Sequence, residues 1–232
     1  MTNSIISGAQ MNDVLSYSPI LIEGTITTIT LTLASAIVAL LISFIVGLAR
    51  LSKMWLVRWV AIIYLEFFRG TSAIVQMFFI YYVLPLLGVS LSPLLAGIIA
   101  CGLNVGAYGS EIVRAAVQAV ERPQHEAALS LNYNSYQLYR YVLIPQAIPM
   151  MIPTFGNLLI ELLKLTAVAS LITISDLTFM AQIIRVQTAL TLEPFLVILI
   201  IYFAISSTLI AITNLIEKKF SKGRNTVQAG GS

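Results

Sequence analysis

Long apolar stretches with almost no charge dominate this chain. Residues 26–46 and 195–212 contain no Asp, Glu, Lys or Arg. A helix of about twenty residues crosses a hydrocarbon core of about 30 Å, so each stretch is long enough to span a membrane. The apolar positions run on without alternating, which favours transmembrane helices over the strands of a barrel. The pattern therefore predicts an all-α integral membrane protein.

Five transmembrane helices are predicted in all. They cover residues 25–48, 57–84, 94–117, 149–171 and 194–216. Pro85, Gly88 and Pro93 mark the tight loop between the second and the third. The resulting division is an N-terminal arm (1–24), a transmembrane domain (25–217) with an inner loop at about 120–145, and a tail (218–232) whose last four residues, 229–232, resemble a linker remnant. Residues 1–10 lack the basic start and compact apolar run of a cleaved signal.

Basic residues gather on one side of these five helices. The first loop, the loop at 120–145 and the tail carry most of them: Arg50, Lys53, Arg58, Arg122, Arg140, Lys218, Lys219, Lys222 and Arg224. The arm and the loop around Pro85 carry none. The positive-inside rule then predicts an outer N-terminus and a cytoplasmic C-terminus, as an odd number of crossings requires.

Composition excludes several classes of protein. The chain is 58% hydrophobic and 10% charged, whereas a soluble domain carries about 25% charged residues. The single cysteine, Cys101, excludes an internal disulfide, and the single histidine, His125, argues against a metal site. A net charge of +3 is too small to indicate nucleic-acid binding. No phosphate-binding Gly-x-x-x-x-Gly-Lys-Ser/Thr loop is present, so any ATP would be hydrolysed by another chain.

The loop at 120–145 carries the most informative pattern. Glu126-Ala127-Ala128 is followed after three residues by Asn132, and after nine more by a Val-x-Ile-Pro segment that ends at Pro145. We expect a short helix that begins at Glu126, whose charge suits the positive end of a helix. Asn132 tolerates the left-handed conformation that ends a helix. Pro145 and Pro149 would then redirect the chain into the fourth span.

This spacing resembles the cytoplasmic signature of permease subunits of bacterial type I ABC importers, in which Gly occupies the position of Asn132. Residues 69–72, Arg-Gly-Thr-Ser, are similar to the Arg-Gly-Thr-Pro segment of the polar-amino-acid subfamily, the histidine, glutamine and arginine permeases. Ser72 replaces the proline, so we expect a softer kink there or none. Residues 104–114 and 156–166 resemble the third and fourth spans of the same subfamily, although Leu165 stands where Asp is common.

The resemblance implies that this chain is not itself an enzyme. It implies that the helix at Glu126 couples to a separate ATPase subunit that uses ATP and Mg²⁺, and that no cofactor or metal binds here. The other implied partners are a second permease subunit, identical or homologous, and an extracytoplasmic binding protein. Such a permease lies in the bacterial inner membrane and imports polar amino acids or related zwitterions by alternating access. The segment 173–191 would serve as an outer gate or as a surface for the binding protein.

Polar residues inside the spans are candidates for the solute pathway, because a small polar solute needs hydrogen-bonding groups. The candidates are Gln76, Asn104, Asn157 and Glu161, with Lys164 and Thr166 secondary. Alternatively, these groups bond helix to helix or seal a subunit interface.

Charged residues three apart on one helical face offer possible ion pairs. Such pairs are Glu66 with Arg69, Glu111 with Arg114, and Glu161 with Lys164.

Other functions compete with that of an amino-acid importer. An importer of a compatible solute such as ectoine would share the same pattern. A secondary transporter would use Glu161 or Glu111 as an ion site, but no inverted repeat is visible. An intramembrane enzyme would need a nucleophile with a base, or metal ligands, and the predicted spans show neither. A passive channel would not account for the motif in the loop at Glu126.

Overall fold

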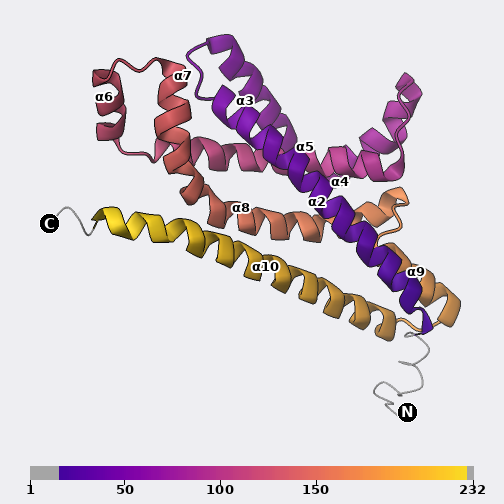
Figure 1. Ribbon diagram of the computed structural model, residues 1–232. Coiled ribbons are helices and arrows are strands. Elements are labelled where there is room, and N and C mark those ends of the chain that lie inside the picture. The colour runs from indigo at the N-terminus through magenta and orange to yellow at the C-terminus, as the bar shows by residue number, and fades with distance from the viewer. Residues whose placement is uncertain (1–15, 229–232) are drawn as a thin grey trace. The chain divides into compact units, whose positions relative to one another are not determined.

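The computed structural model describes residues 16–228, with side chains as far as residue 220. The described chain is helical, and no strand occurs between residues 16 and 228 (Figure 1). The all-α prediction is therefore confirmed.

Four helical runs are long and apolar enough to cross a membrane. They are α2 (Ser18–Ala49), α5 (Pro93–Gln118), the run Ser135–Ile172, and α10 (Leu192–Gln228). In α10 the candidate span is Leu192–Phe220. The run Ser135–Ile172 joins α7 (Ser135–Gln137), the π-helix η3 (Leu138–Leu143), α8 (Ile144–Thr166) and the 3₁₀-helix η4 (Ala167–Ile172). A fifth span is reached only if α3 (Trp55–Gly70) is counted together with the helices that follow it, α4 (Ala73–Phe78), the π-helix η1 (Phe79–Val83) and the 3₁₀-helix η2 (Leu84–Leu87).

The helix break between α3 and α4 contradicts the expectation of a softer kink. Thr71 (φ −115°, ψ 151°) and Ser72 (φ −69°, ψ 134°) are both extended, so the helix stops completely without a proline. The Thr71 hydroxyl donates to the Phe67 carbonyl over 2.7 Å, which satisfies one of the acceptors at the end of α3. Such bonding from a hydroxyl to the carbonyl four residues earlier weakens a helix at that point.

Several helix ends differ from the predicted boundaries. α2 begins at Ser18, inside the predicted arm, and α10 continues into the predicted tail as far as Gln228. α8 begins at Ile144 and contains Pro149 within it, so Pro149 does not mark the start of the span as predicted. The remaining parts of the arm and the suggested linker remnant, residues 1–15 and 229–232, lie outside the described residues.

The chain divides into two compact units. Unit 1 comprises Met1–Ile37, Ser72–Cys101 and Glu161–Thr208, and unit 2 comprises Val38–Thr71, Gly102–Ile160 and Leu209–Ser232. The helices α2, α5, α8 and α10 each contribute a part to both units.

The core of unit 1 is built around α9 (Leu177–Thr188). Leu177, Ala181 and Ile184 of α9 pack with Leu21 of α2 and Ile198 of α10. Gly24 permits this packing, because a Cβ atom there would lie 3.0 Å from the Cα of Leu177. The Leu177 amide also donates to the Thr28 hydroxyl over 3.0 Å, which fixes the start of α9 against α2.

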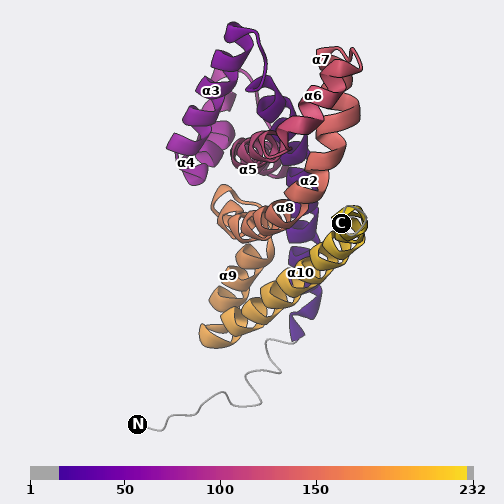
Figure 2. The ribbon, with the colours of Figure 1, turned by 90° about the vertical axis from the view of Figure 1, so that its left-hand side faces the viewer.

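The core of unit 2 joins α5 to the run that starts with α7. Val113, Ala116 and Val117 of α5 pack against Leu143, Ala147 and Met151, with Phe44 and Phe155 alongside. Two glycines bring α2 and α5 together: a Cβ on Gly47 would lie 2.7 Å from the Ser110 carbonyl, and one on Gly109 would lie 2.0 Å from the Ser43 hydroxyl. The short helix α6 (Arg122–Ser130) lies beside η3, the segment that follows α7 (Figure 2).

Candidate functional site

The helix predicted at Glu126 exists as α6, but it begins earlier than predicted. Its first residue is Arg122, a proline stands in its first turn, and Glu121 occupies the N-cap without a side-chain cap bond. Glu126 is therefore the fifth residue of the helix rather than the first. Because the helix dipole acts mainly within the first turn, the predicted stabilisation of Glu126 at the positive end is wrong.

The end of α6 follows the prediction made from Asn132. Asn132 adopts the left-handed conformation with φ 58°. The Asn132 amide donates to the Leu129 carbonyl over 2.9 Å, and the Tyr133 amide donates to the Ala128 carbonyl over 3.1 Å. These two bonds form a Schellman motif, the usual way in which a left-handed residue ends a helix. Asn can stand here because it tolerates this conformation better than residues other than glycine.

One side of α6 packs inward and the other presents apolar side chains to the surroundings. Ala128 is buried, whereas Ala127 is exposed and Leu129 and Leu131 are 63% and 69% exposed. Glu126 itself lines a cavity of about 360 Å³ together with His125 and Arg122. The apolar wall of that cavity comes from the end of α5 and from η3, and includes Val117, Val120 and Leu143.

The segment after α6 is joined to it by a further contact. Pro145 is exposed in the first turn of α8, and the next residue, Gln146, donates through its side-chain amide to Gln124 of α6 over 3.2 Å. The motif residues from Glu126 to Pro145 therefore belong to one continuous region of unit 2.

The predicted pathway residues on α8 share one exposed face. Asn157, Glu161 and Lys164 are exposed, and Thr154 extends the same row at helical spacing. Leu162 and Leu163 on the opposite side are buried. Asn157, Glu161 and Lys164, called here the α8 stripe, therefore present an amide, a carboxylate and an ammonium in the second half of an apolar helix.

The other predicted pathway residues are buried. Asn104 is 6% exposed and donates to the Phe68 carbonyl over 3.1 Å. In an unbroken helix that carbonyl would accept the Ser72 amide, so Asn104 replaces a bond lost at the break after Gly70. Thr166 is fully buried and donates to the Leu163 carbonyl over 2.7 Å, and Gln76 is 7% exposed. The bond of Asn104 joins α5 to α3 and agrees with the alternative of bonding between helices, whereas the bond of Thr166 stays within α8.

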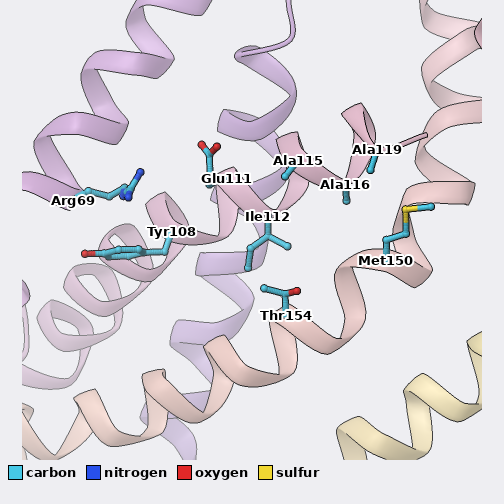
Figure 3. Close-up of a pocket in the computed structure, with 9 residues that line it drawn as sticks. All are labelled: Arg69, Tyr108, Glu111, Ile112, Ala115, Ala116, Ala119, Met150 and Thr154. Carbon is cyan, nitrogen blue, oxygen red and sulfur yellow. The ribbon is translucent and has the colours of Figure 1, made fainter. Parts of the chain in front are cut away.

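A cavity of about 580 Å³ lies within unit 2 (Figure 3). Helix α5 and the residue that follows it supply much of its wall through Tyr108, Glu111, Ile112, Ala115, Ala116 and Ala119. Arg69 from the end of α3 and Met150 and Thr154 from α8 complete the lining. This size suits a small-molecule site, and the lining combines small apolar side chains with a few polar groups.

Glu111 is the centre of an ion-pair network in unit 2. The predicted pair with Arg114 is present, and Arg50, which follows the end of α2, bonds to the other carboxylate oxygen. Arg114 also donates to Gln118. The spacing of three residues identified Arg114, but nothing in the sequence connects Glu111 with Arg50.

The predicted pair of Glu66 with Arg69 does not form within residues 16–220. The Arg69 guanidinium instead lies over the ring of Tyr108, with its central carbon 5.5 Å from the ring centroid. The aromatic face attracts the cation because its π electrons carry partial negative charge. Glu161 and Lys164 likewise form no ion pair in the described part of the chain.

Unit 1 contains a buried carboxylate that motif analysis placed only within a broad outer segment. Asp176 is fully buried and caps α9 by accepting the Phe179 amide over 2.9 Å. The Tyr202 hydroxyl donates to it over 3.5 Å. Burial raises the pKa of Asp176 to about 6, because desolvation disfavours the charged form more than these bonds favour it. An Asp directly before an apolar helical stretch could have predicted that Asp176 caps a helix, but not that it is buried.

Comparison with known proteins gives a direct answer about the family. Residues 39–222 match the family described as "Binding-protein-dependent transport system inner membrane component". The chain belongs to this family. It is therefore a multi-pass inner-membrane permease of a binding-protein-dependent ABC transporter, and a transport component rather than an enzyme. Membership implies an ATPase partner and a binding-protein partner.

The permease is similar to several curated relatives. It is 43% identical over 208 residues to the probable amino-acid ABC transporter permease protein y4tF of Sinorhizobium fredii, covering 87% of each chain. It is 38% identical to the L-cystine transport system permease protein TcyB of Bacillus subtilis, covering 89% of each.

Solved structures resemble the permease as well. The crystal structure of an amino acid ABC transporter with histidines matches at a TM-score of 0.84 and 36% identity, over 94% of this chain and 100% of that one. An inward-facing MetNI methionine ABC transporter matches at a TM-score of 0.74, and at 17% identity it shows the fold alone.

Proposed function

We propose that this permease forms the membrane path of an ATP-driven importer of polar amino acids or related zwitterions. The observation that carries the proposal is the exposed, oppositely charged pair of Glu161 and Lys164 on the apolar helix α8. A charge at the bilayer centre costs about 2.5–3.5 kcal/mol on insertion scales, so such side chains face water, solute or another subunit rather than lipid. The relatives named as amino-acid and cystine permeases support this substrate class.

The chemistry of the α8 stripe suits a zwitterion. Glu161 attracts an ammonium group and Lys164 attracts a carboxylate, while the Asn157 amide accepts from an ammonium or donates to a carboxylate. The stripe has no net charge, so it favours solutes whose own charges balance. A compatible solute such as ectoine has the same charge pattern and is the alternative substrate.

Helix α6 is the proposed contact with the ATPase. The exposed side chains Ala127, Leu129 and Leu131 offer a narrow apolar surface for a groove in the partner. The Schellman turn at Asn132 and the bond between Gln124 and Gln146 support transmission of a movement of α6 to α8. ATP and Mg²⁺ bind to the ATPase subunits, and alternating access follows their closure and reopening.

The proposed orientation follows from the basic residues of unit 2. This unit contains the first basic loop, the loop at 120–145 and the basic tail, and these are placed in the cytoplasm. The N-terminus is then outside. A second permease subunit, identical or homologous, completes the path, because four to five spans are too few to enclose one.

Uptake by the complete transporter in proteoliposomes, with ATPase and loaded binding protein, tests the proposal. Glu161→Gln is expected to lower ATP-driven uptake of L-glutamine or L-cystine at least tenfold, while basal ATP hydrolysis stays unchanged. Glu126→Lys is expected to uncouple the transporter, so that ATP hydrolysis continues while solute uptake falls. The reason is that it reverses the charge beside the proposed ATPase contact. Glu121→Gln is the control, since Glu121 is exposed and forms no side-chain cap bond.

Two results would refute the proposal. Uptake by the permease alone, driven by an ion gradient, would favour the secondary transporter. Wild-type kinetics in Glu161→Gln would remove the α8 stripe from the path.

A further inference from the structure

The arginines around the cavity of unit 2 differ in their partners. Glu111 is the only carboxylate among the described residues that line the cavity, and it is bonded to both Arg50 and Arg114. Arg69 also lines the cavity, yet no acidic side chain lies within ion-pair distance of it in the described structure. The cavity therefore has a cation that forms no ion pair with an acidic side chain of residues 16–220.

The surroundings of Arg69 hold the cation without neutralising it. The guanidinium lies above the Tyr108 ring, whose face attracts the cation (Figure 3). The N–H donors of a guanidinium lie in its plane, and two of them side by side form an edge that can bind an anion. Arg69 also stands in the last turn of α3, where the negative end of the helix favours a cation.

A guanidinium edge has a strong preference for one kind of ligand. Two parallel N–H groups match the two oxygens of a carboxylate, and such bidentate bonds are stronger and more selective than neutral ones. An uncompensated arginine within a membrane-spanning region requires an anion or water as its partner. The remaining walls of the cavity are apolar or weakly polar, and include Ile112, Met150, Ala115 and Thr154.

We propose that Arg69 binds the carboxylate of the transported solute in this cavity, with Tyr108 as the platform that positions it. The proposal rests on the proposed function, in that it requires a solute with a carboxylate. It adds a carboxylate-binding site in unit 2 to the charged stripe of α8. Glu111 leaves the charge of Arg69 unbalanced, because its own ion pairs are with Arg50 and Arg114.

Equilibrium binding to the purified permease–ATPase complex, without binding protein, tests this assignment. The probes are radiolabelled L-glutamine and its α-amide, L-glutaminamide, which lacks the carboxylate. Arg69→Gln is expected to weaken L-glutamine binding about ten- to a hundredfold, the range for a hydrogen-bonded charged group, and to leave binding of the amide unchanged. Arg69→Lys keeps the charge but loses the two-pronged geometry, so we expect a loss about midway between wild type and Arg69→Gln.

Matched variants separate recognition from folding. Tyr108→Leu removes the ring and is expected to lower the affinity for L-glutamine severalfold, because nothing then positions the Arg69 guanidinium. Arg185→Gln is the control for loss of an exposed arginine, since Arg185 lies on α9 in unit 1. Should Arg69→Gln not assemble, the selectivity of Arg69→Lys between the acid and the amide decides the question.

The outcomes distinguish this inference from the proposed function. If wild type neither binds nor imports any amino acid, the proposed function fails. If wild type imports L-glutamine or L-cystine and Arg69→Gln binds and transports it equally well, only the assignment of Arg69 is overturned. An equal loss for L-glutamine and its amide also overturns it, because Arg69 would then only shape the cavity.

Discussion

The two units of this permease handle charge in opposite ways. Unit 2 contains eleven Lys and Arg against five Glu, a formal charge of +6, whereas unit 1 contains two against five Asp and Glu, a formal charge of −3. In unit 2 the carboxylate of Glu111 is met by two arginines. In unit 1 the carboxylate of Asp176 is met by a backbone amide and hydroxyl groups, and by no cation within residues 16–220.

The contrast shows two ways in which the fold accommodates a carboxylate, one partly exposed and one fully buried. A neighbouring cation balances the charge of the carboxylate and favours its ionised form. Hydrogen bonds alone only partly offset desolvation, and the pKa of Asp176 rises to about 6 as a result. The carboxylate in unit 1 is therefore sensitive to moderate acidity. Three comparisons between the units test how far this difference extends, in order of decreasing expected effect.

Helix packing gives the largest expected difference. A Cβ at Gly47 in unit 2 would lie 2.7 Å from the Ser110 carbonyl, part of a rigid backbone. A Cβ at Gly97 in unit 1 would lie 2.6 Å from the end of the flexible Ile174 side chain. We expect Gly47→Ala to lower the free energy of unfolding by about 3 kcal/mol and Gly97→Ala to change it by less than about 1 kcal/mol. Thermal unfolding in detergent measures both, and equal losses would contradict the comparison.

Removal of each carboxylate gives the second difference. Glu111→Gln leaves Arg50 and Arg114 without a counter-charge, which should cost about 1–2 kcal/mol because the site is partly exposed. Asp176→Asn keeps an acceptor for the cap of α9 and removes a buried charge, so the variant should be as stable as wild type at pH 7.5 or more stable. Unfolding temperatures of the two variants at that pH provide the measurement.

The pH dependence sharpens this second comparison. The pKa of Asp176 is raised in the folded state, from 3.8 to about 6, so the folded protein takes up the proton first as pH falls. Its protonation therefore stabilises the fold at low pH, and this stabilisation is lost as pH rises through about 6. Relative to Asp176→Asn, wild type should gain up to about 3 kcal/mol between pH 7 and pH 4. A constant difference across that range would count against a buried, uncompensated Asp176.

Left-handed turns give the smallest expected difference. Asn132 in unit 2 (φ 58°) and Thr173 in unit 1 (φ 65°) both stand in a conformation that favours glycine. Asn tolerates it, but a β-branched residue does so at a cost of about 1–2 kcal/mol. We expect Asn132→Gly to leave the unfolding temperature unchanged. Thr173→Gly should raise the free energy of unfolding by up to about 1 kcal/mol. The loss of the hydrogen bond between the Thr173 and Tyr81 hydroxyls reduces this gain. A lower unfolding temperature for Thr173→Gly would show that this bond outweighs the strain.

Local features were predictable because they depend on neighbours along the chain. The uninterrupted apolar runs determined the helical membrane fold, and the spacing of three residues determined the pair Glu111–Arg114. Asn132 was identified as a left-handed helix end from its residue type alone, and the loop motif pointed to the permease family that the comparisons confirm.

Contacts between distant segments were decided only by the tertiary structure. Arg69 and Glu66 have suitable spacing, yet Arg69 lies over Tyr108 because α3 and α5 pack together in unit 2. Arg50 reaches Glu111 across a separation of 61 residues, and Asn104 bonds to a carbonyl freed by the helix break. The sequence fixes which side chains share a helical face, since the helix repeat is constant. Which partner each one meets depends on how the helices pack, and no local pattern encodes that choice.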